Sequence, residues 1–338
     1  MVLQTSGPIS LSQIQTEFGG SDPISMTEYY RNGAYVTANN TSVPTTGAIT
    51  LSSSFYGAIR QFTYTITTNI QQANLATILT NAGWDGVAPA VVTINAGLYI
   101  WSDSTSVGGL IISSAFNNKL TLYNYGKIIG RGGNGATPPG GSPGGNGASG
   151  GPAIANSASS IVIYNQSGAY IAGGGGGGGS GSSGDGSGGG GGAGGGSGGN
   201  QFGQNDGGAG GAIGQTGGLA AWGTSLALEN QTAAGAGGAS GKYRQALNDW
   251  GRGGGGGGRI LPGVGGVNPG YTDEDVTNSA GSAGTSGSPY VLKGGGGGGW
   301  GASGGAGGNG SAGGSGGAAV SGTTVTLTNS GTVYGSVA

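Results

Sequence analysis

Apolar and polar residues near the N-terminus follow a pattern typical of short, capped helices. Three similar segments carry it: PISLSQIQ (8–15), PISMTEYY (23–30) and AITLSSSFYG (48–57). Ser10 with Gln13, and Ser25 with Glu28, have the spacing of a capping box, in which each side chain binds a backbone N–H of the first turn. The third segment fits less closely, with Thr50 in the capping position. Such short helices bury little alone, so we expect them either to dock on a partner or to cap the next domain.

From residue 62 the alternation changes to that of short strands. Four segments are rich in β-branched and aromatic residues: FTYTITT (62–68), AVVTINAG (90–97), LYIWS (98–102) and GGLIISS (108–114). Between the first two, NLATILTNAGW predicts a short helix that ends at Gly83. These segments supply enough apolar side chains for a small α+β core.

A repeat frames the glycine-rich part of the chain. Its three copies are LTLYNYGKIIG (120–130), IVIYNQSGAYIAG (161–173) and VTLTNSGTVYG (325–335). Each copy predicts a strand, a turn built on Asn and Gly, and a second short strand, because Asn and Gly tolerate left-handed backbone. We expect these units to stack and to anchor the ends of the glycine segments.

Glycine accounts for 90 of the 338 residues, with uninterrupted runs at 173–179, 253–258 and 294–299. A flexible linker is the usual interpretation of such sequence, and a glycine-rich β-stack is a second alternative. Collagen needs glycine at every third position with abundant proline, and this chain has neither. We favour polyglycine II, an extended helix of three residues per turn whose N–H and C=O groups bind neighbouring helices.

These patterns predict a chain that is mainly β and irregular. Residues 1–60 form a docking module with short helices, and residues 61–131 form a small α+β connector. Residues 132–338 form a domain of packed polyglycine II helices, framed by short strands and closed by the last repeat.

Composition narrows the chemistry that the chain can perform. The net charge is −2, with only 7% charged residues and neither histidine nor cysteine. Nucleic acid binding, thiol and imidazole catalysis, and the usual zinc sites are therefore not expected. No segment reaches the ~20 apolar residues of a membrane span. The acidic cluster Asp273–Asp275 lies on one loop and lacks the spacing of a calcium loop or the opposed carboxylates of a glycosidase. We expect no cofactor, no metal and no enzymatic activity.

The quoted segments resemble those of bacteriophage tail-fibre and receptor-recognition proteins. The opening helical segments are similar to a module shared by many phage structural proteins, and the middle through LTLYNYGKIIG is similar to glycine-rich phage tail proteins. The glycine runs resemble the tip adhesins of T-even-like phages, in which polyglycine II helices pack as a sandwich and present variable loops. The resemblance implies a virion protein of the tail fibre or tail tip.

The resemblance also implies that loops between glycine segments recognise the host. The candidate loops begin at Asn200, Leu219, Gly241 and Asn268. They hold residue types enriched at binding hot spots: Phe202, Trp222, Tyr243, Arg244, Trp250 and Tyr271. The expected receptor is an outer-membrane protein or a glycan of the bacterial surface. Residues 1–60 would bind other phage tail proteins, and a homotrimer is one assembly left open.

Three other interpretations compete with adhesion. The first is a virion structural or decoration protein without recognition. The second is a polyglycine ice-binding protein, which needs a flat, regular face. The third is a cell-wall or capsule hydrolase, which would release glycan.

Overall fold

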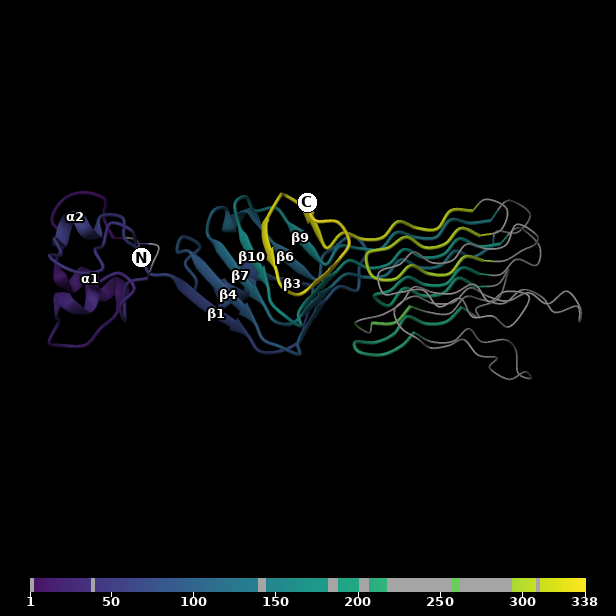
Figure 1. The fold of residues 1–338 in the computed structure, drawn as a ribbon, viewed down its shortest axis with the longest axis horizontal. Helices are drawn as coiled ribbons and strands as arrows, with labels where there is room; N and C mark the ends of the chain where they lie inside the picture. The colour runs from purple at the N-terminus through teal and green to yellow at the C-terminus, as the bar shows by residue number, and fades with distance from the viewer. Residues whose placement is uncertain are drawn as a thin grey trace, which may run out of the picture.

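The computed structural model divides into a helical module, a stack of strands and a set of glycine-rich segments (Figure 1). The residues that it describes are 3–37, 40–138, 144–181, 188–200, 207–217, 257–259, 261, 294–307 and 311–338. None of the helices in these ranges is long and apolar enough to cross a membrane. Strands and irregular segments dominate, as the sequence predicts.

The N-terminal module has three short helical elements: α1 (Leu11–Phe18), the 3-10 turn η1 (Met26–Tyr29) and α2 (Leu51–Phe55). They enclose a core of their own, in which Ile14, Tyr29 and Phe55 are fully buried. The Tyr29 hydroxyl donates a hydrogen bond to the Gly19 carbonyl, 2.8 Å away, and so ties η1 to the end of α1.

Only one of the three predicted caps forms as expected. Ser10 and Gln13 make the full capping box of α1. At η1, the Ser25 hydroxyl accepts from the Thr27 N–H, so the predicted box with Glu28 is wrong for this single 3-10 turn. Thr50 makes no side-chain cap at α2.

The described part of residues 62–334 contains fourteen short strands, and every pairing between them is parallel. The strands are β1 (Phe62–Ile66), β2 (Ile70–Gln71), β3 (Ala73–Asn74), β4 (Ala90–Ile94), β5 (Tyr99–Trp101), β6 (Leu110–Ile112), β7 (Leu120–Asn124), β8 (Lys127–Ile129), β9 (Ile154–Asn156), β10 (Val162–Asn165), β11 (Tyr170–Ala172), β12 (Val320–Gly322), β13 (Thr326–Asn329) and β14 (Thr332–Tyr334). The helix α3 (Leu75–Asn81) and the turn η2 (Ser114–Phe116) lie between strands.

These strands form three sheets, with the orders β1-β4-β7-β10-β13, β14-β11-β8-β5-β2 and β12-β9-β6-β3. The chain visits the three sheets in turn and then returns to the first, so each circuit is one coil of a parallel β-solenoid. Inward positions align in register, as with Val92, Leu122 and Ile163, and are fully buried. Stacking such coils gives the stem a continuous apolar core.

The Asn–Gly repeat forms an asparagine ladder along one corner of the solenoid. Asn124 Nδ2 donates to Asn165 Oδ1, and Asn165 Nδ2 donates to Asn329 Oδ1, each at 2.8 Å. Asn124 Oδ1 also accepts from the Gly126 N–H at 3.0 Å and holds the turn. The prediction that the three repeats stack is therefore confirmed, and the side-chain amides supply the register.

Replacing Asn165 with Ala should lower the free energy of unfolding by about 2 to 4 kcal/mol, because it strips a partner from two neighbouring amides. Asn165 is 1% exposed, so water cannot replace the lost bonds. Urea unfolding measures the effect. Thr324→Ala, at an exposed position outside the ladder, is the control and should cost less than about 0.5 kcal/mol. Equal losses in the two variants would contradict the ladder's role.

The glycine-rich segments are insertions at another corner of the same solenoid. They leave after β8 and return at β9, then leave after β11 and return at β12. The sheets thus run through the boundary expected at residue 131, because β9 to β14 lie beside β1 to β8. The division into parts at residues 60 and 131 stays a prediction.

Candidate functional site

The six predicted receptor-contact residues, Phe202, Trp222, Tyr243, Arg244, Trp250 and Tyr271, lie outside the described residues. The described segments that precede and follow them along the chain form the candidate site. We call the described glycine-rich segments between residues 131 and 318 the glycine sheaf. It extends from the solenoid on the side opposite the N-terminal module (Figure 1).

Segment 173–180 lies at the centre of the glycine sheaf and forms hydrogen bonds in a three-residue rotation. Its N–H groups donate to carbonyl oxygens of neighbouring segments at 2.7–3.0 Å. The pairs, with the donor first, are Gly174–Gly151, Gly175–Ala193, Gly176–Ala302, Gly177–Ala148, Gly178–Gly190 and Gly179–Gly305. Each neighbouring segment is thus reached by every third residue. A β-strand instead alternates between two sides.

The carbonyl groups of the same segment follow the same rule toward three further segments. They accept hydrogen bonds from N–H groups of these segments at 2.7–2.9 Å. The pairs, with the donor first, are Gly317–Gly174, Gly133–Gly175, Gly298–Gly176, Gly314–Gly177, Ala136–Gly178 and Gly295–Gly179. Six segments therefore surround this one, and its buried backbone groups find partners without any side chain.

This arrangement explains why the central run consists of glycine alone. A Cβ at Gly177 would overlap the carbonyl oxygen of Asn134, and one at Gly176 would overlap that of Gly314. Outer segments have fewer neighbours and tolerate side chains on their open side, as at Asn146 and Ser149, which are exposed. The number of surrounding segments therefore decides where side chains are allowed.

Side chains on outer segments also bind backbone groups and fix the register of the glycine sheaf. Asn134 Oδ1 accepts from the Ser197 N–H at 2.9 Å, and Asn146 Oδ1 accepts from the Ala312 N–H at 2.9 Å. A uniform glycine run can slip by three residues without losing a hydrogen bond, so such contacts at single positions select one alignment.

The directions of the segments determine where their turns lie. As the donor advances from Gly174 to Gly177, its acceptor retreats from Gly151 to Ala148, so these segments are antiparallel. Among the described residues, the chain reversals between these segments lie near the solenoid. Turns near the solenoid are described at 194–195, 212–215 and 300–301. At the far end, the described residues stop at 138, 181, 200 and 307, and they resume at 144, 188, 207 and 311.

A small apolar cluster joins the glycine sheaf to the solenoid. The side chain of Trp300 is fully buried and packs with Ile129, Ala172 and Ala193, which are also fully buried. The next residue, Gly301, has a φ of 66° and donates to the Gly173 carbonyl at 2.7 Å. Trp300 thus holds a turn of the glycine sheaf against two strands.

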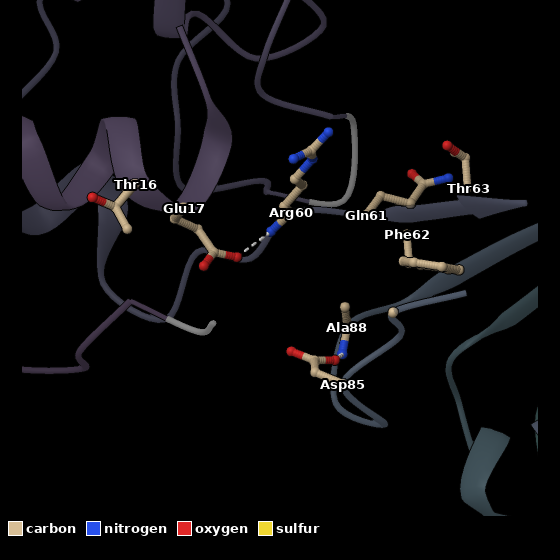
Figure 2. Close-up of a pocket in the computed structure, with 9 residues that line it drawn as sticks. Thr16, Glu17, Arg60, Gln61, Phe62, Thr63, Asp85 and Ala88 are labelled. Carbon is tan, nitrogen blue, oxygen red and sulfur yellow. Dashed lines mark hydrogen bonds between the residues drawn. The ribbon is translucent and has the colours of Figure 1, made fainter. Parts of the chain in front are cut away.

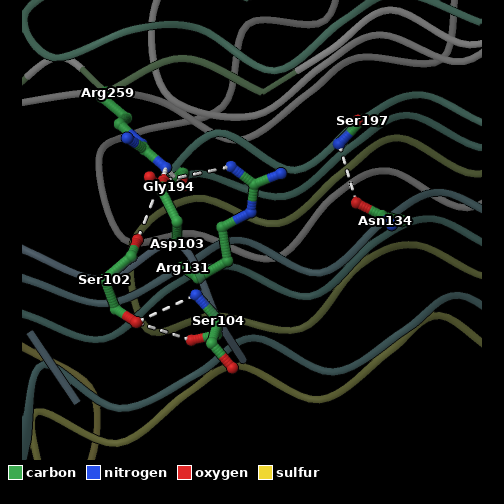
Figure 3. Close-up of polar contacts among 8 residues, drawn as sticks. All are labelled: Ser102, Asp103, Ser104, Arg131, Asn134, Gly194, Ser197 and Arg259. Carbon is green, nitrogen blue, oxygen red and sulfur yellow. Dashed lines mark hydrogen bonds and ion pairs between the residues drawn. The ribbon is translucent and has the colours of Figure 1, made fainter. Parts of the chain in front are cut away.

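An ionic cluster forms a second attachment at the same base (Figure 3). The Arg259 side chain is 6% exposed and forms an ion pair with Asp103. Its Nε donates to the Gly194 carbonyl at 3.1 Å. Arg131 NH1 lies 3.7 Å from the same carboxylate. Burial and the charge of Arg259 lower the pKa of Arg131, while Asp103 opposes that shift.

A cavity of about 410 Å³ lies where the N-terminal module meets β1 (Figure 2). Glu17 Oε1 accepts from the Arg60 N–H at 2.8 Å. Asp85 Oδ1 accepts from the N–H groups of Ala88 and Val87, each at 2.9 Å, and these bonds lower the pKa of Asp85. The two carboxylates therefore hold backbone at this junction.

Sequence reasoning missed the ionic cluster at the base of the glycine sheaf. Arg259 follows the second long glycine run and Trp300 follows the third, so a bulky residue at the end of a run was an available signal. Asp103 lies in a serine-rich corner and gave no signal, because its partners are 28 and 156 residues away in the sequence.

Comparisons with known proteins bear on the function of this arrangement. The solved gp37-gp38 adhesin tip complex of the bacteriophage S16 long tail fiber contains a chain of similar fold, with a TM-score of 0.55 and 23% identity. The match covers 99% of this chain and 100% of that one. A search of curated proteins found no match. The family model described as phage tail fibre adhesin Gp38 matches residues 61–243, more than half of the 338 residues. This chain therefore belongs to the phage tail fibre adhesin Gp38 family.

Proposed function

We propose that this adhesin of the virion tail fibre presents its receptor-contact loops at the far end of a bundle of polyglycine II helices. The observation that carries the proposal is the three-residue rotation of hydrogen bonds around segment 173–180. Polyglycine II has three residues per turn and no internal hydrogen bonds, and its backbone groups point sideways to neighbours. The six surrounding segments and the glycine-only centre fit that helix and do not fit a pleated sheet.

In this proposal the glycine sheaf holds the two ends of each loop in fixed positions, which a flexible glycine linker would not do. Because ordering each residue costs about 1–2 kcal/mol, a bare glycine run holds a fixed shape only when its neighbours and its base hold it. The Trp300 cluster and the Arg259–Asp103 pair supply the base. A rigid support with loops at one end suits recognition, since the loops can vary without disturbing the core.

We assign receptor contact to Phe202, Trp222, Tyr243, Arg244, Trp250 and Tyr271. Asn200 and Gly207 support this for the loop that holds Phe202, because Asn200 Oδ1 accepts from the Gly207 N–H at 3.1 Å and closes the loop's ends at the far end. Aromatic and arginine side chains give large contact areas at low entropic cost. The receptor is an outer-membrane protein or a surface glycan.

Residues 1–60 dock the adhesin to another tail fibre protein. The compact core of this module and its position at the end opposite the glycine sheaf support that role (Figure 1). The S16 structure is a complex of gp37 with gp38, and we propose a corresponding partner here. Binding and display account for these features without catalysis, so we propose that the chain is not an enzyme.

Replacing the loop at 241–252 with a Gly–Ser linker of equal length should abolish adsorption of otherwise intact phage to its host. The loop carries Tyr243, Arg244 and Trp250, three of the six proposed contacts. Free phage remaining after mixing with cells measures adsorption. Thr324→Ala, at an exposed position on the solenoid, is the control. Normal adsorption by the loop variant would contradict the proposal.

A further inference from the structure

The outer face of the first sheet carries hydroxyl, amide and tyrosine side chains in regular columns. Its strands point alternate residues inward, and the residues between them face outward. The in-register ladder continues past the strands, since Tyr125 N–H donates to Ile94 O at 3.0 Å and Gln166 N–H to Asn124 O at 2.9 Å. We call this surface the threonine–tyrosine face: Thr63, Thr65, Val91, Thr93, Asn95, Thr121, Tyr123, Tyr125, Val162, Tyr164, Gln166, Thr326, Thr328 and Ser330.

Three tyrosines form the centre of this face. The rings of Tyr123 and Tyr164 stack on adjacent strands, with centroids 4.9 Å apart and planes 10° from parallel. Tyr125 is 43% exposed and lies two residues beyond Tyr123 on the same side. All fourteen side chains are at least partly exposed, and none carries a charge.

The solenoid itself does not need these tyrosines. In the column of Tyr123 and Tyr164, the neighbouring coils carry Thr93 and Thr328. The turn that holds Tyr125 has Ser330 at the matching position of the last repeat, Asn329-Ser330-Gly331. The same backbone therefore accepts small hydroxyl residues at all three sites, and ring size there serves another purpose.

The chemistry of the face selects its ligand. Its fourteen residues carry no charge, and the ammonium of Lys119, which precedes Thr121 in the same alternation, donates to the Gly86 carbonyl at 3.2 Å. The face therefore offers little to a charged peptide or a polyanion. A second copy packed face to face would bury its hydroxyl and amide groups largely without matched partners, which is costly. A sugar chain offers a hydroxyl donor and acceptor at each unit together with apolar ring faces, and it satisfies both kinds of group.

We propose that the threonine–tyrosine face binds an uncharged polysaccharide of the host cell surface, with Tyr123, Tyr125 and Tyr164 as its centre. The inference goes beyond the loop-borne function proposed above, because the face lies on the solenoid and shares no residue with the loops. Polysaccharide binding along the stem would hold the fibre tip near the surface while the loops find their receptor.

The test uses the full chain and immobilised surface polysaccharide purified from the strain on which the phage is grown. Binding is measured by biolayer interferometry at low and high salt. The triple variant Tyr123→Thr, Tyr125→Ser, Tyr164→Thr copies residues that the same columns already carry, so it should fold. We expect it to bind at least tenfold more weakly than the parent, and we expect parental binding to be insensitive to salt because no charge is involved.

Two controls separate this face from other surfaces. Tyr56→Ser removes an exposed tyrosine of the N-terminal module and should leave polysaccharide binding unchanged. The chain with loop 241–252 replaced should also bind polysaccharide normally, so failure of the loop proposal leaves this result intact. Should the triple variant unfold early, Tyr125→Ser alone gives the same comparison, with an expected loss of about threefold.

The proposal is overturned if the parent chain does not bind the polysaccharide, or if the tyrosine variants bind as well as the parent. It is also overturned if only the loop replacement abolishes binding. Self-association of the parent that the triple variant lacks would assign the face to a second copy instead.

Discussion

Gly177→Ala should destabilise the glycine sheaf by about 4 kcal/mol or more, a large effect for the addition of one methyl group. The new Cβ would overlap the carbonyl oxygen of Asn134, which is backbone and cannot rotate away. Relief requires two segments to separate, and Gly177 also bonds to segments containing Ala148 and Gly314. Several lateral hydrogen bonds are therefore lost together.

Amide hydrogen exchange of residues 174–179 measures this effect directly, since their N–H groups exchange only when the glycine sheaf opens. Ser149→Ala is the matched control. Ser149 lies on the neighbouring segment with its side chain exposed, so the change should cost less than about 0.5 kcal/mol. If Gly177→Ala kept parental protection, segment 173–180 would not be packed on all sides.

Trp300→Ala should cost about 3–5 kcal/mol, as expected for truncating a fully buried large aromatic residue. The cavity would open between Ile129, Ala172 and Ala193, at the point where the glycine sheaf meets the solenoid. Backbone there is fixed by hydrogen bonds to the strands, so the walls can collapse only in part. We expect the glycine sheaf to loosen first while the solenoid core persists.

Urea unfolding followed by limited proteolysis distinguishes these two parts. Cleavage within residues 173–318 should appear at lower urea in Trp300→Ala than in the parent, with the strands up to β8 still protected. Trp300→Phe fills most of the space and should lose less than half as much stability. Simultaneous unfolding of both parts, or no change, would contradict the anchoring role.

Local sequence signals predicted those elements that depend only on neighbouring residues. The capping box at Ser10 and Gln13 formed because its partners lie three residues apart. At Ser25 the same spacing failed, since the chain there makes a single 3-10 turn tied to Gly19 through Tyr29. The strand–turn–strand repeats were recognisable because the period of two and the Asn–Gly turns are local.

The closure of these strands into one solenoid was not predictable from local pattern. The alternation of residues 62–114 suggested a separate α+β unit, yet β1, β4 and β7 lie in one sheet with β10 and β13. The signal was hidden because 147 residues (173–319) separate β11 from β12 along the chain, while the two strands lie in successive sheets of one coil. Long insertions at a corner leave coil stacking intact.

By itself, the sequence determined the local features of this adhesin: short strand–turn–strand units marked by the Asn–Gly repeat, and glycine runs whose only strong hydrogen-bonding groups are in the backbone. The tertiary structure alone decided which segments surround one another, where Arg259 meets Asp103, and which tyrosines share a surface. The physical reason is that a bare backbone carries no positional information, so its register and neighbours are fixed by the solenoid and by a few side chains at its base.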